Sequence, residues 1–261
     1  MDTIPIVMTA FGTTADALST YAALDDRIRR SFPDEEIIWT YSSRVVTRRL
    51  QASDKPALHL EEALDELAAR GVGKAVVQSL HLFPGSEFHR LAKIVGKSGL
   101  QCAVGAPLFT TPEDYERLGL ILEPIVGDNP EQAVLILGHG TGHPVWTAYY
   151  ALEKILRRRF GRRLFVGVVE KFPDSSHLPD EIAARGFAET IIVPLFLVGG
   201  MHVFRDIVGN GEDELSWMSR LQERNITPTC FHHGLGLVPG MAELVVDHIA
   251  EARRKLLLAD N

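Results

Sequence analysis

The chain has 261 residues, 46% of them hydrophobic and 23% charged, which is enough for one large domain or two smaller ones with their own cores. A formal net charge of −7 excludes general binding to nucleic acids, and two cysteines are too few for a disulfide framework or a zinc ribbon. The N-terminus shows no signal peptide and no apolar run approaches the ~20 residues of a membrane helix, so we expect a cytoplasmic protein without membrane contact.

Strands and helices alternate along the first half of the chain. Apolar runs predict buried strands, and helical periodicity predicts the helices between them. The predicted strands cover residues 4–9, 36–41, 75–80 and 101–105, and the predicted helices cover 16–31, 42–50, 57–70, 86–97 and 112–125. Four turn-forming residues at 127–130 indicate a linker after the last of these helices.

The same alternation starts again at Ala133. Here the predicted strands cover residues 133–137, 164–169, 190–197 and 226–231, and the helices cover 145–160, a short stretch ending at 185, 212–224 and 239–258. Such alternation is typical of parallel sheets with helices on both faces. We therefore predict an α/β fold of two similar halves, 1–128 and 129–261, with the active-site cleft between them.

Spacings between matching residues indicate that the two halves are an internal duplication. Gly12 and Gly140 differ by 128 positions, as do Cys102 and Cys230. In the middle of each half, Leu-Ala-Ala-Arg70-Gly matches Ile-Ala-Ala-Arg185-Gly at a spacing of 115. The difference between the two spacings predicts an insertion in each half. In the first half it follows the second strand, and in the second half it follows the third strand.

The sequence Gly138-His139-Gly140 follows directly after the predicted strand 133–137. In open α/β sheets ligands bind at the carboxyl ends of strands, and glycine lets other groups approach the backbone closely. This placement favours a catalytic role for His139. An ordinary loop histidine beside a turn fits the same three residues.

The duplication places His139 at the position of Phe11, Glu170 at that of Ser42, and His202 at that of Glu87. The second half thus has His, Glu and His at or just beyond three successive strand ends, where the first half has Phe, Ser and Glu. Imidazole and carboxylate ligands from neighbouring strand ends form a plausible divalent-metal site. With ten histidines in the chain, chance placement is the alternative.

The other histidines and the cysteines carry weaker predictions. His143 is expected to line the same cleft as His139, and His81 ends the third strand, where it either contacts substrate or is simply packed. His89 is expected to be solvated, and His232 and His233 to be structural. The two cysteines are expected to behave as small hydrophobic residues at equivalent places in the fourth strands.

The combination of motifs resembles the anaerobic sirohydrochlorin cobalt chelatases of cobalamin biosynthesis, which belong to the class II chelatases and share a two-half fold with the protoporphyrin ferrochelatases. The resemblance rests on Phe11-Gly12-Thr13, Gln78-Ser79-Leu80-His81, Gly138-His139-Gly140, Val168-Val169-Glu170, Pro194-Leu195-Phe196-Leu197-Val198-Gly199-Gly200-Met201-His202 and Asp213-Glu214-Leu215-Ser216-Trp217. It implies ATP-independent insertion of Co²⁺, with His139, Glu170 and His202 as the cobalt ligands. Gly200-Met201 departs from the family's more usual Gly-Asp and leaves the ligand intact.

The expected substrates are sirohydrochlorin (or precorrin-2) and Co²⁺, with Fe²⁺ as the alternative metal and no organic cofactor. His139 is expected to accept a pyrrole proton as well, and Glu87 to relay protons from the other half. Sirohydrochlorin carries eight carboxylates, for which the arginines of the first insertion are our candidates, although an ordinary solvated helix face explains them equally well. The residues predicted to contact the tetrapyrrole are Phe11, Ser42, Arg44, Arg48, His81 and His143, with Arg49 beside them.

Three alternative functions stay open on the sequence alone. The same fold could insert Fe²⁺ for siroheme synthesis, because imidazole and carboxylate ligands suit both metals. A carrier of tetrapyrrole or metal, or a two-lobed small-molecule binding protein, would use a similar cleft without turnover. A homo-oligomer is neither indicated nor excluded by the sequence.

Overall fold

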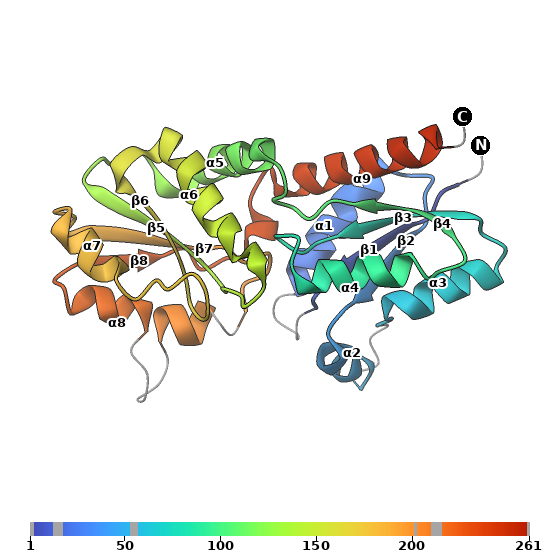
Figure 1. The fold of residues 1–261 in the computed structure, drawn as a ribbon, viewed down its shortest axis with the longest axis horizontal. Helices are drawn as coiled ribbons and strands as arrows, with labels where there is room; N and C mark the ends of the chain where they lie inside the picture. Colours follow the sequence, from blue (N-terminus) through green and yellow to red (C-terminus); the bar gives the residue numbers. More distant parts are fainter. Residues whose placement is uncertain (1–2, 13–17, 53–56, 201–202, 210–215, 260–261) are drawn as a thin grey trace. The chain divides into compact units, whose positions relative to one another are not determined.

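The computed structural model describes residues 3–12, 18–52, 57–200, 203–209 and 216–259. The chain divides into two compact units, each containing one parallel sheet of four strands (Figure 1). Unit 1 comprises Met1–Thr110 together with Gly240–Asn261, and unit 2 comprises Thr111–Pro239. Among the described residues, none of the helices is long and apolar enough to cross a membrane.

Unit 1 is built around β1, whose five residues are all buried because neighbouring strands flank it and helices cover both faces. Its strands are β1 (Ile6–Ala10), β2 (Ile37–Tyr41), β3 (Lys74–Ser79) and β4 (Gln101–Gly105), in the order β2-β1-β3-β4. Its helices are α1 (Leu18–Ser31), α2 (Arg44–Gln51), α3 (Leu60–Ala69), α4 (Ser86–Val95) and α9 (Met241–Leu258). Helices α3 and α4 pack on one side of the strands through a buried core that includes Val7, Leu64, Val77 and Leu91.

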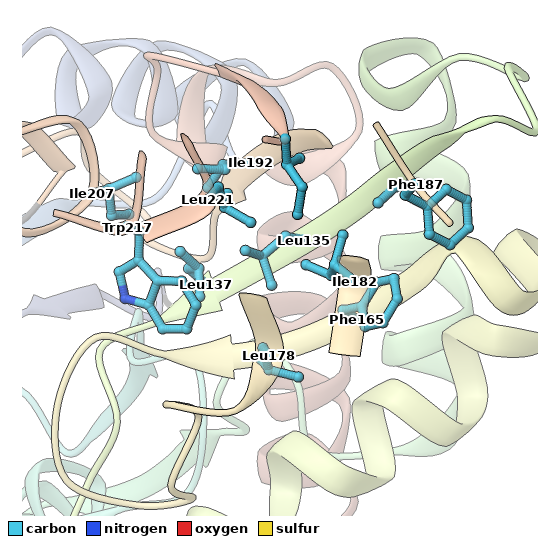
Figure 2. Packing of buried hydrophobic residues seen from close by; sticks show 12 residues of the cluster. Leu135, Leu137, Phe165, Leu178, Ile182, Phe187, Ile192, Ile207, Trp217 and Leu221 are labelled. Atoms are coloured by element: carbon cyan, nitrogen blue, oxygen red, sulfur yellow. The ribbon is translucent and has the colours of Figure 1, made fainter. Parts of the chain in front are cut away.

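Unit 2 repeats this arrangement around β5. Its strands are β5 (Gln132–Gly138), β6 (Leu164–Val168), β7 (Glu189–Pro194) and β8 (Thr227–Cys230), in the order β6-β5-β7-β8. Its helices are α5 (Pro112–Val126), α6 (Thr147–Phe160), α7 (Leu178–Ala184) and α8 (Trp217–Gln222), with a π-helical segment at Val203–Val208. Leu135, Leu137, Phe165 and Trp217 belong to its buried core, where α7 and α8 meet the sheet (Figure 2).

The division into units differs from the predicted boundary at residue 128. Helix α9 belongs to unit 1, where Arg253 pairs with Glu35 at 2.6 Å and His248 Nδ1 lies 3.2 Å from the Ala106 carbonyl oxygen. Helix α5 belongs to unit 2, where it packs on α6. The turn-forming residues 127–130 therefore connect α5 to β5 inside one unit, and they do not separate the halves.

Strand pairing shows how the two halves correspond. Ile6 pairs with Ile37 and Val76, just as Val134 pairs with Leu164 and Ile191. This register confirms the internal duplication, including the correspondence of Phe11 with His139 at a spacing of 128.

Two of the predicted correspondences are wrong by one or two residues. The N–H of Ser43 donates to the carbonyl of Phe11, and the N–H of Glu170 donates to the carbonyl of His139, both at 3.1 Å, so Glu170 corresponds to Ser43 and not to Ser42. Cys230 pairs with Ile192, the counterpart of Val77, whereas Cys102 pairs with Ala75. The two cysteines therefore lie two positions apart in the register of the fourth strands, and they are not at equivalent places.

Element ends deviate from the predictions where local hydrogen bonds decide them. Helix α2 begins at Arg44, since the Ser43 hydroxyl accepts from the Val46 N–H at 3.4 Å and caps the helix. The predicted helix 145–160 divides into a 3₁₀ turn, Pro144–Trp146, and α6. Ser216 caps α8, and the start of the predicted helix 212–224 lies outside the described residues.

We expect Phe165→Ala to destabilise unit 2 by about 3–5 kcal/mol, because it leaves a cavity in a fully buried site. The Phe165 ring is 0% exposed, lies edge to face with Phe187 at 6.0 Å, and has the Arg185 guanidinium 4.8 Å above it. Urea unfolding followed by tryptophan fluorescence measures the change. Leu120→Ala, at a side chain that is 54% exposed, is the control and should stay within about 0.5 kcal/mol of the wild type.

Candidate functional site

The loop that follows β5 is held close to the backbone that follows β6. Gly140 has a φ of 87°, and a Cβ at this position would lie 1.7 Å from the Glu170 carbonyl oxygen. At Gly138 a Cβ would lie 2.4 Å from the ring of Tyr149, whose hydroxyl accepts the Gly140 N–H at 3.1 Å. Burial raises the pKa of Tyr149, so this hydroxyl stays protonated at neutral pH. Glycine at both positions is therefore a geometric requirement of the site.

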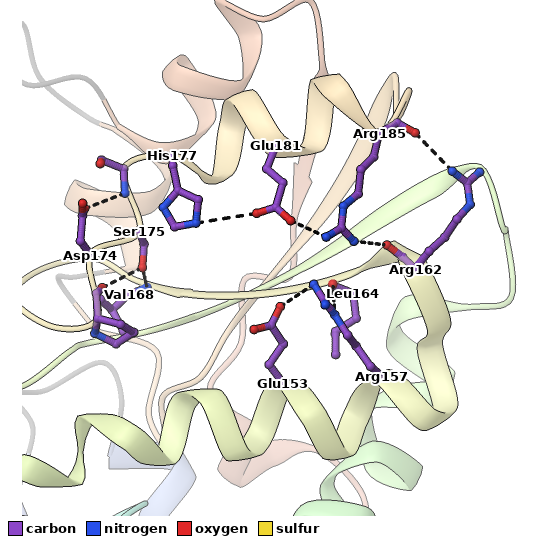
Figure 3. Close-up of polar contacts among 12 residues, drawn as sticks. Glu153, Arg157, Arg162, Leu164, Val168, Asp174, Ser175, His177, Glu181 and Arg185 are labelled. Carbon is purple, nitrogen blue, oxygen red and sulfur yellow. Dashed lines mark hydrogen bonds and ion pairs between the residues drawn. The ribbon is translucent and has the colours of Figure 1, made fainter.

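The loop after β6 is tied back to its own strand. The buried Ser175 hydroxyl accepts the Val168 N–H and donates to the Pro173 carbonyl, both at 3.0 Å (Figure 3). The N–H of Thr141 in turn donates to the carbonyl of Phe172 at 3.2 Å. These bonds fix the segment that carries Glu170 against the segment that carries His139.

Two of the three predicted metal ligands lie together as a result. His139 Nδ1 is 3.3 Å from Glu170 Oε1 and 3.2 Å from the Gly140 carbonyl oxygen. Because both neighbours accept hydrogen bonds, we place the proton of the neutral ring on Nδ1, which puts its lone pair on Nε2. The two side chains are 39% and 45% exposed, and both are accessible to a ligand.

Two further side chains shape this pair. The Lys171 ammonium lies 3.2 Å from the same Glu170 oxygen, so the carboxylate is partly neutralised. The Phe196 ring meets the His139 ring at a centroid distance of 6.3 Å and an interplanar angle of 68°. Phe196 thereby limits the orientations open to the imidazole.

The third predicted ligand, His202, lies outside the described residues. Within the described ranges no three His, Cys, Asp or Glu side chains group as a metal site. His143 is half-buried, and its Nδ1 accepts the Val145 N–H at 3.1 Å at the start of the turn that precedes α6. This hydrogen bond fixes the ring of His143 four residues after His139.

In unit 1 the equivalent strand ends carry different side chains. Phe11, the counterpart of His139, is 56% exposed. The carbonyls of His81 and Phe196 accept equivalent hydrogen bonds, from the N–H groups of Leu108 and Leu235, so these two residues correspond. In unit 1, Phe11 follows β1 and His81 follows β3, whereas in unit 2 a histidine follows β5 and a phenylalanine follows β7.

A cavity of about 700 Å³ opens beside these strand ends in unit 1. It brings together four predicted residues: Ser42, Arg44, Arg48 and Glu87. His59 and Arg90 also line it, and sequence reasoning missed both. The available signal was that Arg90 follows Glu87 by three residues on a helix, where side chains meet.

His81 and Glu87 are half-buried, and each has one buried polar atom without a partner among the described residues. His81 Nδ1 lies 2.9 Å from the Ser79 hydroxyl, whereas its Nε2 has no hydrogen-bond partner in the described chain. Burial lowers the pKa of His81 to about 4, an effect opposed by Glu87 and reinforced by Arg90. Glu87 Oε1 lies 3.4 Å from Arg90, and Oε2 is buried and likewise unpartnered among these residues. The predicted placement of Glu87 across from His202 stays a prediction.

A family model described as "Cobalt chelatase (CbiK)" matches residues 5–254. The chain belongs to the cobalt chelatase family. Among the relatives of this family member, "Sirohydrochlorin cobaltochelatase CbiKC" of Nitratidesulfovibrio vulgaris is 31% identical over 95% of this chain and 89% of its own. "Sirohydrochlorin cobaltochelatase" of Salmonella typhimurium is 27% identical over 95% of both chains.

The fold of this cobalt chelatase is similar to that of a solved structure, "SirB from Bacillus subtilis with Fe3+". The match has a TM-score of 0.66 and covers 96% of each chain at 14% sequence identity. At that identity the likeness concerns the fold alone, and it confirms the predicted α/β architecture of two similar halves.

We expect Gly140→Ala to destabilise unit 2 and to weaken metal binding, because the added Cβ meets the Glu170 carbonyl at 1.7 Å and the backbone has a φ of 87°. A loss of roughly 1–3 kcal/mol in thermal or urea unfolding is expected. Gly142→Ala, two residues away with nothing within 4 Å of its Cβ, is the matched control. Equal behaviour of the two variants would contradict the close-approach argument.

The depressed pKa of His81 predicts a pH-dependent stability. Between the ordinary value of 6.5 and the folded value of about 4, the unfolded chain binds a proton that the folded chain does not. The unfolding free energy should therefore fall by roughly 1.4 kcal/mol per pH unit as the pH drops through this window. His81→Phe, which introduces the residue found at the equivalent Phe196, should remove this slope. Urea titrations of both proteins from pH 7 to pH 4 measure it, and parallel curves would exclude a neutral buried His81.

Proposed function

We propose that this protein inserts Co²⁺ into sirohydrochlorin without ATP, as an enzyme of cobalamin biosynthesis. The observation that carries the proposal is the close pairing of His139 with Glu170 at two neighbouring strand ends of unit 2. Imidazole and carboxylate are ligands that suit Co²⁺. The relatives named sirohydrochlorin cobaltochelatase support this metal and this tetrapyrrole over Fe²⁺ insertion and over a carrier without turnover.

On the metal side, we assign His139, Glu170 and His202 as the ligands of the incoming Co²⁺. The Nε2 atom of His139 is the binding nitrogen, while Nδ1 donates toward Glu170 or Gly140 and orients the ring. Lys171 competes with the metal for Glu170 Oε1. This competition keeps the ligation weak, which a chelatase needs because a tightly held metal would not leave for the macrocycle.

On the proton side, Co²⁺ replaces two pyrrole protons, so the site must accept both. Once the metal has moved to the macrocycle, Nε2 of His139 is a base for one of them. We assign the second to Glu87, whose Oε2 has no hydrogen-bond partner in the described part of unit 1. His81 beside it is neutral at pH 7, and it therefore adds no positive charge where protons must leave.

Contacts to the tetrapyrrole are proposed for strand-end residues that are not metal ligands. The exposed ring of Phe11 offers an apolar surface, and the Ser42 hydroxyl, His81 and His143 offer polar contacts. The arginines of α2, Arg44 and Arg48, are assigned to the substrate carboxylates.

His139→Ala should abolish most cobalt insertion, by about 100-fold or more, because it removes both a ligand and a base. Glu170→Gln keeps the shape but loses the charge and should reduce insertion less. The control is His177→Ala, an exposed histidine of unit 2 that pairs with Glu181 (Figure 3). Spectrophotometric assays under anaerobic conditions, with sirohydrochlorin in excess over enzyme, measure all three.

The same assay separates an enzyme from a carrier. An enzyme gives many equivalents of metallated product per chain, whereas a carrier saturates at stoichiometric binding. Parallel runs with Co²⁺ and Fe²⁺ compare the metals directly. Near-normal turnover in His139→Ala would contradict the metal assignment.

A further inference from the structure

The first arginine of α2 is placed where ordinary helix energetics disfavour it. Arg44 is the first residue of the helix, where the positive end of the helix dipole repels a cation, and the first turn contains no acidic residue. Arg48 follows at i+4, where two like charges repel. In the described chain neither guanidinium has a carboxylate within 4 Å, in contrast to most other arginines of the protein.

Helix α6 shows how the same chain treats structural arginines. Its last turn carries Arg157, Arg158 and Arg159 at the negative end of the helix dipole, and each pairs with a glutamate. Figure 3 shows the first of these pairs, Arg157 with Glu153 at 2.7 Å. Helix α2 differs in that Arg44 stands at the positive end of the helix dipole, and neither Arg44 nor Arg48 has a carboxylate partner in the described chain, which argues against a purely structural role.

Arg44 and Arg48 both line the 700 Å³ cavity of unit 1, which we call the arginine cavity. Three carboxylates also line it, but each is stabilised by other groups. Glu87 lies beside Arg90, and Glu61 and Glu62 occupy the first turn of α3, where the helix dipole favours acids. Glu62 in addition accepts the His59 N–H at 2.7 Å. Arg44 and Arg48 thus have no carboxylate of the described chain within 4 Å, although three carboxylates line the same cavity.

The remaining polar groups of the arginine cavity also suit an anion. The Ser42 hydroxyl is buried and has no partner among the described residues, so it can donate to a ligand oxygen. His59 Nδ1 lies 3.0 Å from the Tyr41 carbonyl, which orients its ring at the cavity wall. Guanidinium groups bind carboxylates through paired hydrogen bonds, and two such groups match two carboxylates.

We propose that the arginine cavity binds two adjacent carboxylate arms of one pyrrole ring, an acetate and a propionate, and so selects macrocycles that carry both. This inference rests on the proposed function for the identity of the ligand. Tetrapyrroles whose acetate arms have become methyl groups lose one of the two carboxylates on each ring. They leave one arginine without its counter-charge and bind less tightly.

The test compares two metal-free probes with the same macrocycle, uroporphyrin with eight carboxylates and coproporphyrin with four. Fluorescence titrations on the full chain give the ratio of their affinities, at low and high salt. The wild type should favour uroporphyrin by about 10-fold or more, as expected for one additional charge-assisted pair. In the double variant Arg44→Gln/Arg48→Gln this ratio should fall toward one, and Arg48→Lys should retain part of it.

A matched control removes the same charge elsewhere in unit 1. Arg29 and Arg30 pair with Asp25 and Asp26 on the exposed side of α1, so Arg29→Gln/Arg30→Gln should leave the ratio unchanged. The inference is overturned if the wild type binds both probes equally, or if the α2 double variant keeps the wild-type ratio while folding normally by circular dichroism. Because no metal is present, these outcomes are independent of cobalt insertion, whose failure would instead count against the proposed function.

Discussion

The parallel pairing of β5 with β6 and β7 is the constraint on which the candidate metal site depends. All three strands run in one direction, so their carboxyl ends meet at a single edge of the sheet. The backbone after β5 then comes so close to the backbone after β6 that only glycine fits at position 140. His139 and Glu170 are neighbours in space because of this backbone contact, although 31 residues separate them in the chain.

The duplication shows how one backbone can support two kinds of chemistry. Both units place a side chain just after the central strand and another after the third strand, with the same hydrogen bonds behind them. In unit 2 these are His139 and Phe196, and in unit 1 they are Phe11 and His81. An exposed histidine near a carboxylate suits a metal ligand, whereas burial keeps His81 neutral. His139 and His81 are the same residue type, so their different roles follow from their different solvent exposure and neighbouring charges.

Charge distribution adds a second level of asymmetry. A protein with a net charge of −7 repels a substrate with many carboxylates unless positive charge is concentrated locally. The insertion after β2 supplies Arg44 and Arg48 without paired acids, while arginines on α1 and α6 are neutralised by nearby carboxylates. Because Arg44 and Arg48 line one cavity, they supply the local positive charge that the proposed binding surface needs.

The sequence by itself determined most of the strands, the alternation of elements, the duplication and the position of His139 at a strand end. These follow from local patterns, since an apolar run such as 133–137 predicts a buried strand whatever surrounds it. Only the tertiary structure decided that α9 joins unit 1, that Glu170 aligns with Ser43, and that Arg90 and His59 line the cavity with Arg44. The physical reason is that a helix's packing partner, a strand's register and a cavity's walls depend on contacts between residues far apart in the chain, which periodicity does not encode.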